Sequence, residues 1–425
     1  MSAGRDKFGR PVVVVTGMGI STSLGAGKTD NWAKLTAGES GIKTITRFPI
    51  DGLKTTMAGT IDFVTVDPPT STGLSERLAI ITTEEALAQA SIGTKGDFPG
   101  PLFLAVAPVE TEWPQRLEVG RMIGKLEFDI FEVLRVSGGG KYAHLHHRFM
   151  FGSVANKLAE TFGTKGSPIS LSTACASGAT AIQLGVEAIR RGETDAALCV
   201  ATDGSVNPEA VKRFSLLSAL STQNNPPQAA SKPFSKNRDG FVMAEGAGTL
   251  VLESYDAAVA RGARILGVVA GCGELTDSFH RTRSSPDGKP AIGCVLKTLT
   301  DAGMEPDQID HINAHGTSTP ENDKMEYLAT NAVFGEHTSK IPVTSNKSAV
   351  GHTISAAGAV EAIFSLLTLE HQRIPPTLNY DNPDPAIPFD VVGNKSRDAR
   401  VTAVMSNSFG FGGQNASLIL TGEPA

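Results

Sequence analysis

The sequence predicts an α/β protein in which short buried strands alternate with amphipathic helices. An apolar β-branched run at 12–15 leads into the glycine turn at Gly17, as a buried strand does. A similar run begins at Ile265 and leads into Gly271, and the same alternation of elements follows it. With 45 glycines and 24 prolines in 425 residues, the composition suits a compact chain with many tight turns. We therefore predict two similar halves, residues 1–264 and 265–425.

In the first half, apolar runs bounded by turn residues predict strands, and apolar residues at helical spacing predict helices. Ser75 is the expected N-cap of the second helix. The predicted strands are 12–15, 102–107, 168–171, 196–203 and 249–253, and the predicted helices are 31–37, 74–92, 181–188, 208–217 and 255–262.

The second half repeats this alternation on a smaller scale. Its predicted strands are 265–270, 309–314 and 341–345, and its predicted helices are 290–302 and 355–359.

The segment at about 108–150 interrupts the first half. Its 108–141 part is polar and mixed in composition and ends in a glycine-rich hinge at 137–140, which predicts an insertion or lid. Three histidines follow, at His144, His146 and His147. Because no cysteine or carboxylate accompanies them at a metal-ligand spacing, we predict no metal there.

Composition and charge exclude several classes of protein. The net charge of −6 does not favour nucleic-acid binding as the main task. Four widely spaced cysteines, with no Cys-x-x-Cys pair, fit a reducing, cytoplasmic setting. The apolar run at 12–15 is too short for a signal peptide or a membrane span, so we expect no membrane insertion.

A single cysteine, Cys175, stands among small residues at the predicted turn from a strand into a helix. Backbone N–H groups and the positive end of the helix dipole would favour a thiolate there and would hold an oxyanion when a thioester is attacked. Small neighbours would let a substrate approach. The alternative is a buried, inert cysteine of the kind common in cores.

Two histidines in the second half make the reactive interpretation the stronger one. His315 follows the predicted strand 309–314, and His352 follows strand 341–345 and a Ser/Gly turn. Active sites of α/β proteins gather at the carboxyl ends of strands. Cys175, His315 and His352 are therefore expected to share one site.

The number of histidines separates two chemistries. A thioester hydrolase or peptidase needs one base, usually oriented by Asn or Asp. An enzyme that forms a carbon–carbon bond after decarboxylation can use two imidazole N–H donors on the enolate oxygen. Phe409 and Phe411, in the glycine-rich turn 407–415, are candidates to gate the thiol and exclude water; a glycine-rich hairpin with core phenylalanines is the alternative.

At these motifs the chain resembles the β-ketoacyl-acyl carrier protein synthases, the condensing enzymes of fatty acid synthesis, and most of all the elongating type II synthases. The resemblance extends from Val12 to Leu420. It is carried by residues 173–178, 315–320 with Asp323, Lys324 and Glu326, 347–352, 374–379 and 407–413. Initiating synthases of the superfamily usually pair the cysteine with one His and one Asn, so His352 favours an elongating enzyme.

The resemblance implies a thiolase-like fold of five layers, α-β-α-β-α, in a homodimer that needs no cofactor of its own. Cys175 would take the acyl chain as a thioester, and His315 and His352 would assist decarboxylation of malonyl-acyl carrier protein. The product would be a 3-oxoacyl chain extended by two carbons.

Further roles follow from the same resemblance. The backbone N–H groups of Cys175 and Phe411 would form the oxyanion hole, with Phe411 as the gate. Thr317 and Thr319 would bind the phosphopantetheine arm of the acyl carrier protein. Lys347 and Glu326 would form an ion pair beneath the histidines, because two buried charges need one another.

The chain departs from the family where a glycine-rich turn often lines the acyl pocket. Residues 107–113 read Ala-Pro-Val-Glu-Thr-Glu-Trp instead, which suggests a preference for unusual or very long acyl chains. Lys212 and Arg213 are candidates for docking the acidic carrier. The alternatives are a thiolase-like or thioester-hydrolysing enzyme, and a chain-length partner subunit, which would be expected to lack the nucleophile.

Overall fold

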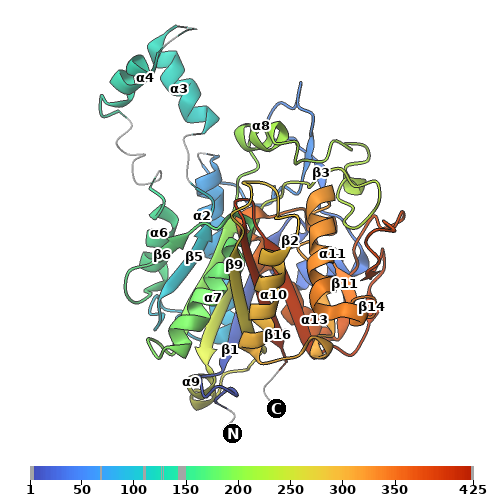
Figure 1. Cartoon of the computed structure of the whole chain (residues 1–425). Helices are drawn as coiled ribbons and strands as arrows, with labels where there is room; N and C mark the ends of the chain where they lie inside the picture. Colours follow the sequence, from blue (N-terminus) through green and yellow to red (C-terminus); the bar gives the residue numbers. More distant parts are fainter. Residues whose placement is uncertain are drawn as a thin grey trace.

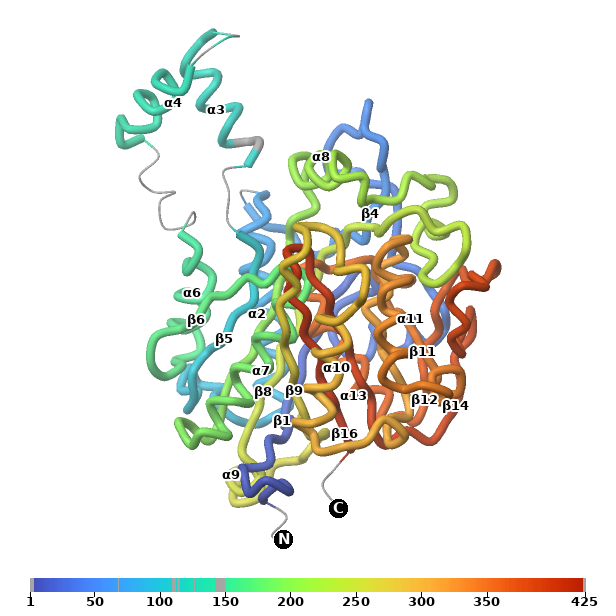
Figure 2. Tube along the Cα trace, viewed as in Figure 1, coloured from blue at the N-terminus to red at the C-terminus, as the bar shows by residue number. Residues whose placement is uncertain are grey.

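The computed structural model of the chain describes residues 4–67, 69–108, 112–125, 127, 129–141 and 150–422. The two ends of the described chain lie at the same end of the molecule (Figure 1). The trace in Figure 2 shows the amino-terminal half, in blue and green, side by side with the carboxyl-terminal half, in orange and red.

The main strands are β1 (Val13–Thr22), β5 (Leu102–Val106), β6 (Ile169–Leu171), β7 (Ala196–Asp203), β8 (Gly246–Ser254), β9 (Gly267–Thr276), β10 (His311–Asn313), β11 (Pro342–Thr344), β13 (Asp390–Val391), β15 (Ala403–Phe409) and β16 (Gln414–Thr421). Short strands are β2 (Gly25–Ala26), β3 (Lys43–Thr44), β4 (Met57–Ala58), β12 (Arg373–Ile374) and β14 (Arg397–Asp398).

The helices are α1 (Gly27–Ala37), α2 (Ser71–Ala90), α3 (Trp113–Ile123), α4 (Ile130–Ser137), α6 (Ser153–Phe162), α7 (Ser177–Arg190), α8 (Pro208–Leu216), α9 (Tyr255–Ala260), α10 (Lys289–Ala302), α11 (Pro320–Phe334), α12 (Lys347–Val350) and α13 (Ala357–His371). Two short 3₁₀ turns, η2 (Ala174–Ala176) and η6 (Ile354–Ala356), lead directly into α7 and α13.

The main strands form one continuous hydrogen-bonded path, β13-β11-β10-β15-β16-β9-β1-β8-β7-β5-β6. Strands of the first half lie at one end of the path and strands of the second half at the other. The two parts join through β1 and β9, which share only the pairs Val14–Val268 and Val15–Gly267. The path is therefore two sheet regions with a narrow junction.

The helices complete five layers. Helices α7 and α13 pack against one another and against strands of both sheet regions, so they form the middle layer. Helix α2 covers the outer face of β1, β8 and β7, and α10 covers the outer face of β9 and β16, with α11 beside it (Figure 1). The order α-β-α-β-α and the mixed α/β composition are those expected from the sequence.

Helix α13 is the most deeply buried element because it has protein on every side. All residues from Ala357 to Leu369 are buried. Among the described residues, the segment Ile354–His371 is the one helical stretch long and apolar enough to cross a membrane, and 83% of it is buried inside the protein. Its apolar character is explained by its place in the middle layer.

The middle helices begin at a close crossing that only glycine permits. A Cβ atom on Gly358 would lie 2.4 Å from the backbone nitrogen of Ala179, and one on Gly178 would lie 2.6 Å from the backbone nitrogen of Ala359. The turn before each helix also contains a residue with left-handed backbone, Ala174 (φ 50°) and Ile354 (φ 45°). The two halves thus repeat the same local geometry, a left-handed residue in a 3₁₀ turn before the helix.

Most predicted elements are present, with corrected boundaries. The second helix begins at Ser71 with Thr70 as its N-cap, so the prediction of Ser75 as the N-cap is wrong. The predicted helix 355–359 is only the start of α13, because the buried helix continues to His371. Helices α3 and α4, in the segment predicted as an insertion or lid, form an arm that stands away from the body (Figure 1). His144, His146 and His147 lie outside the described residues.

We predict that Gly358→Ala destabilises the protein by about 2 kcal/mol or more, because the new methyl group would overlap backbone atoms of α7 that cannot move aside. Gly120→Ala is the matched control: Gly120 is also helical, and a Cβ there meets nothing within 4 Å. Denaturant unfolding of both variants measures the difference. Equal stability of the two variants would show that the close approach of α7 and α13 does not require glycine at position 358.

Candidate active site

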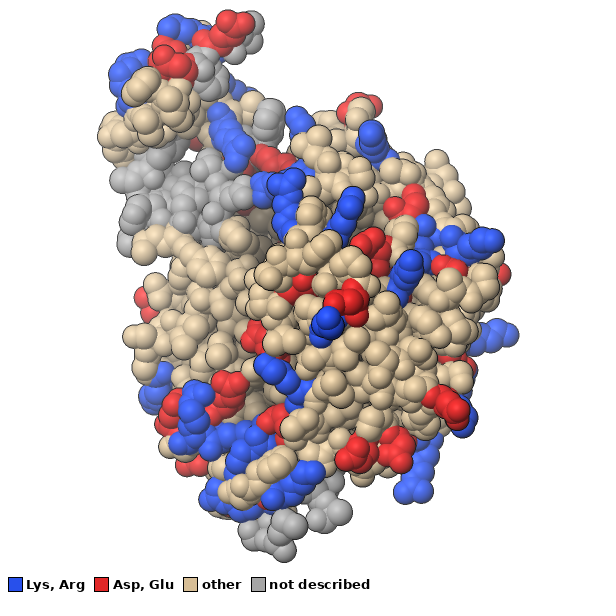
Figure 3. Space-filling model, in the orientation of Figure 1, with Lys and Arg blue, Asp and Glu red and all other residues tan. Residues whose placement is uncertain are grey.

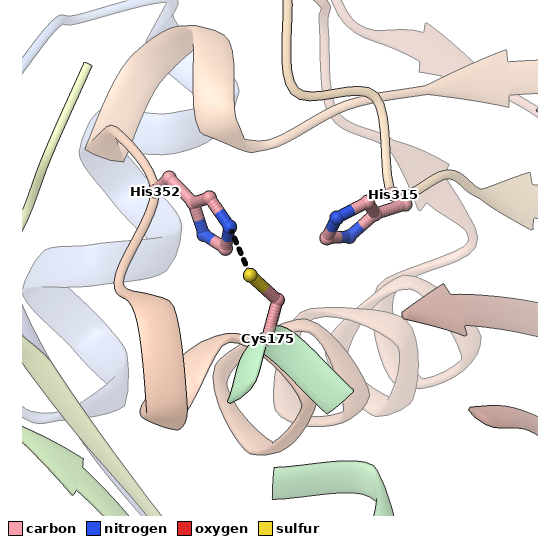
Figure 4. Close-up of side chains that lie close together, drawn as sticks. All are labelled: Cys175, His315 and His352. Atoms are coloured by element: carbon pink, nitrogen blue, oxygen red, sulfur yellow. Dashed lines mark hydrogen bonds between the residues drawn. The ribbon is translucent and has the colours of Figure 1, made fainter. Parts of the chain in front are cut away.

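Cys175 lies in the 3₁₀ turn η2, between strand β6 and helix α7. The Ser177 hydroxyl donates to the Ala174 carbonyl oxygen (2.6 Å) and accepts from the Thr173 backbone N–H (2.8 Å). These bonds close the turn and leave the Cys175 side chain directed toward the carboxyl-terminal half (Figure 4). Cys175 is 8% exposed and lines the active-site cavity described below.

His352 faces the sulfur from the corresponding turn of the second half. Its Nε2 lies 3.1 Å from Cys175 Sγ (Figure 4). The Ile354 backbone N–H donates to His352 Nδ1 (3.2 Å), so the proton of the neutral ring resides on Nε2. His352 therefore presents an N–H donor to the reaction centre.

His315 stands beside His352 at the end of β10. The two imidazole rings are 5.4 Å apart and meet edge to face. Glu326, on α11, fixes the His315 backbone: its two carboxylate oxygens accept from the N–H groups of His315 and Gly316, both at 2.8 Å. Cys175, His315 and His352 are thus brought together as expected, from elements far apart in the sequence.

The predicted ion pair of Lys347 with Glu326 is wrong. Lys347 Nζ instead bonds Glu361 Oε1, on α13, and both side chains are 2% exposed. Glu326 is already occupied by backbone N–H groups and by Asn407 Nδ2 (3.3 Å). The reasoning that the buried ammonium needs a buried carboxylate holds, but the carboxylate belongs to α13.

One cavity, which we call the active-site cavity, is lined by Cys175, both histidines and both predicted phosphopantetheine-binding threonines. The Thr317 and Thr319 hydroxyls are 2.9 Å apart. Thr319 is also the N-cap of α11, so its hydroxyl accepts from the Asn322 N–H. The pair thus lies within reach of any ligand that enters toward Cys175.

Phe409 and Phe411 both line this cavity. Phe409 packs edge-on against His315 at 6.0 Å, and Phe411 packs edge-on against Phe241 at 6.4 Å. The backbone N–H of Phe411 is directed at the Cys175 sulfur. Phe411, the residue predicted to be the gate, therefore lies beside the thiol.

Burial decides the protonation states of the site. It raises the pKa of the Cys175 thiol to about 11, against the lowering effects of the Phe411 N–H and the Lys347 charge. The prediction of a resting thiolate is therefore wrong. It took account of the helix dipole and the backbone N–H groups, but not of the burial of the thiol. Burial also lowers the pKa of His315 and His352 well below the usual value, and the Lys347 ammonium lowers both further. Both imidazoles are therefore neutral near pH 7.

The same three side chains are the candidate metal ligands. Their ligand atoms lie within 4.8 Å of one another. However, the proton on His352 Nε2 occupies the position that a metal would need. The positive charge of the Lys347 ammonium, which lowers the pKa of both rings, also opposes a second cation there. The donor set therefore fits hydrogen bonding to an anion better than coordination of a cation.

Three positioning residues were not found from the sequence: Glu361, Ile354 and Asp203. Asp203, at the end of β7, accepts from the Ser355 N–H (3.1 Å) and from the Ser205 N–H and hydroxyl. It thereby fixes the turn whose Ile354 N–H orients His352. A carboxylate at the carboxyl end of a buried strand was the available signal.

The five-layered fold places the chain among thiolase-like proteins, and comparison with known sequences identifies the family. The chain belongs to the β-ketoacyl synthase family of condensing acyltransferases: residues 10–258 match the family's N-terminal domain and residues 266–381 its C-terminal domain.

Relatives from fatty acid and polyketide synthesis match over nearly the whole chain. A 3-oxoacyl-[acyl-carrier-protein] synthase 2 of Coxiella burnetii is 36% identical, covering 96% of this chain and 98% of the relative. The ketoacyl synthase alpha subunit of the tetracenomycin polyketide synthase of Streptomyces glaucescens is 35% identical, covering 96% of each.

Solved structures agree with the sequence relatives. A β-ketoacyl synthase from Burkholderia phymatum has a TM-score of 0.83 at 32% identity, covering 97% of this chain and 99% of that one. A type II polyketide ketosynthase in complex with its acyl-carrier protein has a TM-score of 0.83 at 31% identity, covering 97% of this chain and 100% of that one.

We predict that Glu361→Gln lowers the free energy of unfolding by about 3 kcal/mol, because it leaves the Lys347 ammonium buried without its carboxylate. Glu187→Gln on the exposed face of α7 is the control and should cost less than about 0.5 kcal/mol, since its pair with Arg191 is exposed. Chemical denaturation measures both. A Glu361→Gln variant as stable as the control would show that the pair contributes nothing to stability.

Proposed function

We propose that the chain elongates an acyl group by decarboxylative condensation with malonyl-acyl carrier protein. The observation that carries the proposal is the convergence of Cys175 with two neutral imidazoles in one cavity. One buried nucleophile and two separate N–H donors match a reaction with an acyl-enzyme and an enolate.

In the first step, the Cys175 sulfur attacks the thioester carbonyl of the acyl-carrier substrate. The C–S bond to the carrier breaks, a new C–S bond to Cys175 forms, and the thiol proton leaves with the carrier thiol. The resting thiol can therefore be neutral without preventing the reaction. The backbone N–H groups of Cys175 and Phe411 hold the transient oxyanion.

In the second step, malonyl-acyl carrier protein loses carbon dioxide. The electron pair of the broken C–C bond passes into the thioester carbonyl, which becomes an enolate. Nε2–H of His352 and the His315 imidazole stabilise the enolate oxygen. The enolate carbon then attacks the acyl group on Cys175, which releases the 3-oxoacyl-acyl carrier protein. The Cys175 thiolate takes up a proton from water.

The remaining predicted residues support these steps. Thr317 and Thr319 bind the phosphopantetheine arm of the carrier, Phe411 opens to admit the acyl chain, and Phe409 holds the face of His315. Lys347 and Glu326 position the histidine loops through their separate partners. The reaction needs no cofactor beyond the phosphopantetheine that the substrates bring.

The partner is an acyl carrier protein, and the working form is a cytoplasmic homodimer. Three basic side chains, Arg116, Lys212 and Arg213, line one surface hollow that suits an acidic carrier. Figure 3 shows basic side chains around α8 and below the arm, interspersed with acidic ones. Among the described residues, β6 at the sheet edge pairs with β5 alone, which leaves a strand edge with the exposed Ile169 available to a second copy.

Retention of Cys175 argues against a chain-length partner subunit, and the second histidine argues against a hydrolase. A specialised synthase for unusual or very long acyl chains remains the alternative form of the same function, and the departure at 107–113 favours it.

The test is mass spectrometry after incubation with an acyl-carrier thioester. Wild-type protein should gain an acyl adduct on Cys175, and Cys175→Ala should gain none. His315→Ala and His352→Ala should still become acylated but should lose malonyl decarboxylation by about 100-fold or more, the effect of removing one oxyanion donor. Near wild-type condensation by either histidine variant would exclude its enolate-stabilising role.

We also predict that malonyl-carrier decarboxylation by Cys175→Ala varies little between about pH 6 and about pH 8. The pKa values of both histidines are lowered, so the neutral rings persist at every pH above those values, and activity should fall only well below pH 6.5. Protonation of His352 would need Nδ1, which the Ile354 N–H occupies. A titration with a midpoint near 6.5 would contradict this assignment.

A further inference from the structure

A second cavity lies next to the active-site cavity. Phe214 and Ile354 line both cavities, so their side chains form the wall between them. Ala174 and Ser355, from the turns that carry Cys175 and orient His352, also face the second cavity. An acyl chain attached to Cys175 that passes this wall therefore enters the second cavity.

The far end of the second cavity is polar. Ser71, Glu112, Asn207 and Glu209 line it together, and the same four residues border a further cavity beyond it. Glu112 is 8% exposed and accepts from the Ser71 N–H at the start of α2 (2.5 Å). Asn207 Nδ2 donates to the Ser71 hydroxyl (2.9 Å). A straight alkyl chain would gain nothing from these groups and would bury them away from water.

Glu209 is the unusual member of this group. It lies in the first turn of α8, and both of its carboxylate oxygens are buried and have no hydrogen-bond partner among the described residues. Arg213, one turn further along α8, lines the same cavity without bonding those oxygens. A buried carboxylate with two unused oxygens is costly unless a donor reaches it.

Glu112 and Glu209 act on one another electrostatically. Burial and, to a smaller extent, the charge of Glu209 raise the pKa of Glu112 to about 7, although the backbone N–H groups of Ser71 and Thr72 act to lower it. Two carboxyl groups at one cavity wall attract a hydrogen-bond donor or a cation in preference to an apolar group.

We infer that the acyl pocket of this enzyme selects acyl chains that carry a hydrogen-bond donor, a hydroxyl or an amino group, near the end remote from the thioester, with Glu209 as the residue that binds it. The wall of Phe214 and Ile354 contacts the apolar part of the chain, and the carboxylates of Glu209 and Glu112 receive the donor. This inference rests on the proposed acylation of Cys175.

The experiment compares pantetheine thioesters of straight acyl chains of matched length with an unsubstituted, a hydroxyl or an amino terminus, over a series of lengths. The rate of adduct formation on Cys175 is followed by mass spectrometry. At one or more lengths, wild-type protein should take the hydroxyl- or amino-bearing chain at least about tenfold faster, the effect of a hydrogen bond to a charged group.

Variants identify the residue responsible. Glu209→Leu should lose this preference and accept the unsubstituted chain as well as or better than wild type does. Glu209→Gln, of nearly equal shape, should weaken the preference for the amino chain more than that for the hydroxyl chain. Glu187→Gln, on the exposed face of α7, should change neither.

The outcomes separate the two proposals. Equal rates for all three chain types in wild-type protein, or a preference for the unsubstituted chain at every length, would overturn the inference while leaving the synthase function intact. A preference that survives in Glu209→Leu would overturn the assignment to Glu209. Absence of any adduct on Cys175, with every thioester, would overturn the synthase function itself and the inference with it.

Discussion

The close crossing of α7 and α13 is the constraint on which the site depends. Gly178 and Gly358 let the two helices begin almost in backbone contact, and a Cβ on either would overlap the other helix. The turn that precedes each helix contains a residue with a left-handed backbone conformation. Because the nucleophile and its histidine lie in or just before these turns, the crossing fixes the 3.1 Å contact between them.

Buried charge then sets the chemistry. Burial lowers the pKa of both imidazoles and keeps them neutral, and the ammonium of the Lys347–Glu361 pair lowers the pKa of both further. A neutral ring with its proton on Nε2 donates to an oxyanion without carrying a charge that would have to be buried in the resting enzyme. The same burial raises the pKa of the Cys175 thiol, so the site at rest has no unpaired charge at its centre.

Much of this arrangement could be predicted from the sequence, because the signals were local. The strand-to-helix turn at Cys175 and the two histidines after strands were recognisable from glycine and small-residue patterns, and the repeat near Ile265 indicated two halves. The partner of Lys347 could not be predicted, since Glu326 and Glu361 both lie on helices near the histidines and only packing decides which one reaches the ammonium. The effect of burial on Cys175 was missed for the same reason.

The second cavity, which we propose is the acyl pocket, was the least predictable part, because its walls come from segments far apart in the sequence. The starts of α2 and α8, the residue before α3 and the turns beside Cys175 meet only in the folded chain. Glu112 and Glu209 look in sequence like ordinary acidic residues at helix starts, where the helix dipole alone would explain them. Their burial at a cavity wall, behind an apolar partition, changes that interpretation. In the proposed mechanism the catalytic groups require only a thioester, and the carboxylates at the far end of the second cavity are the groups that we propose select among acyl chains.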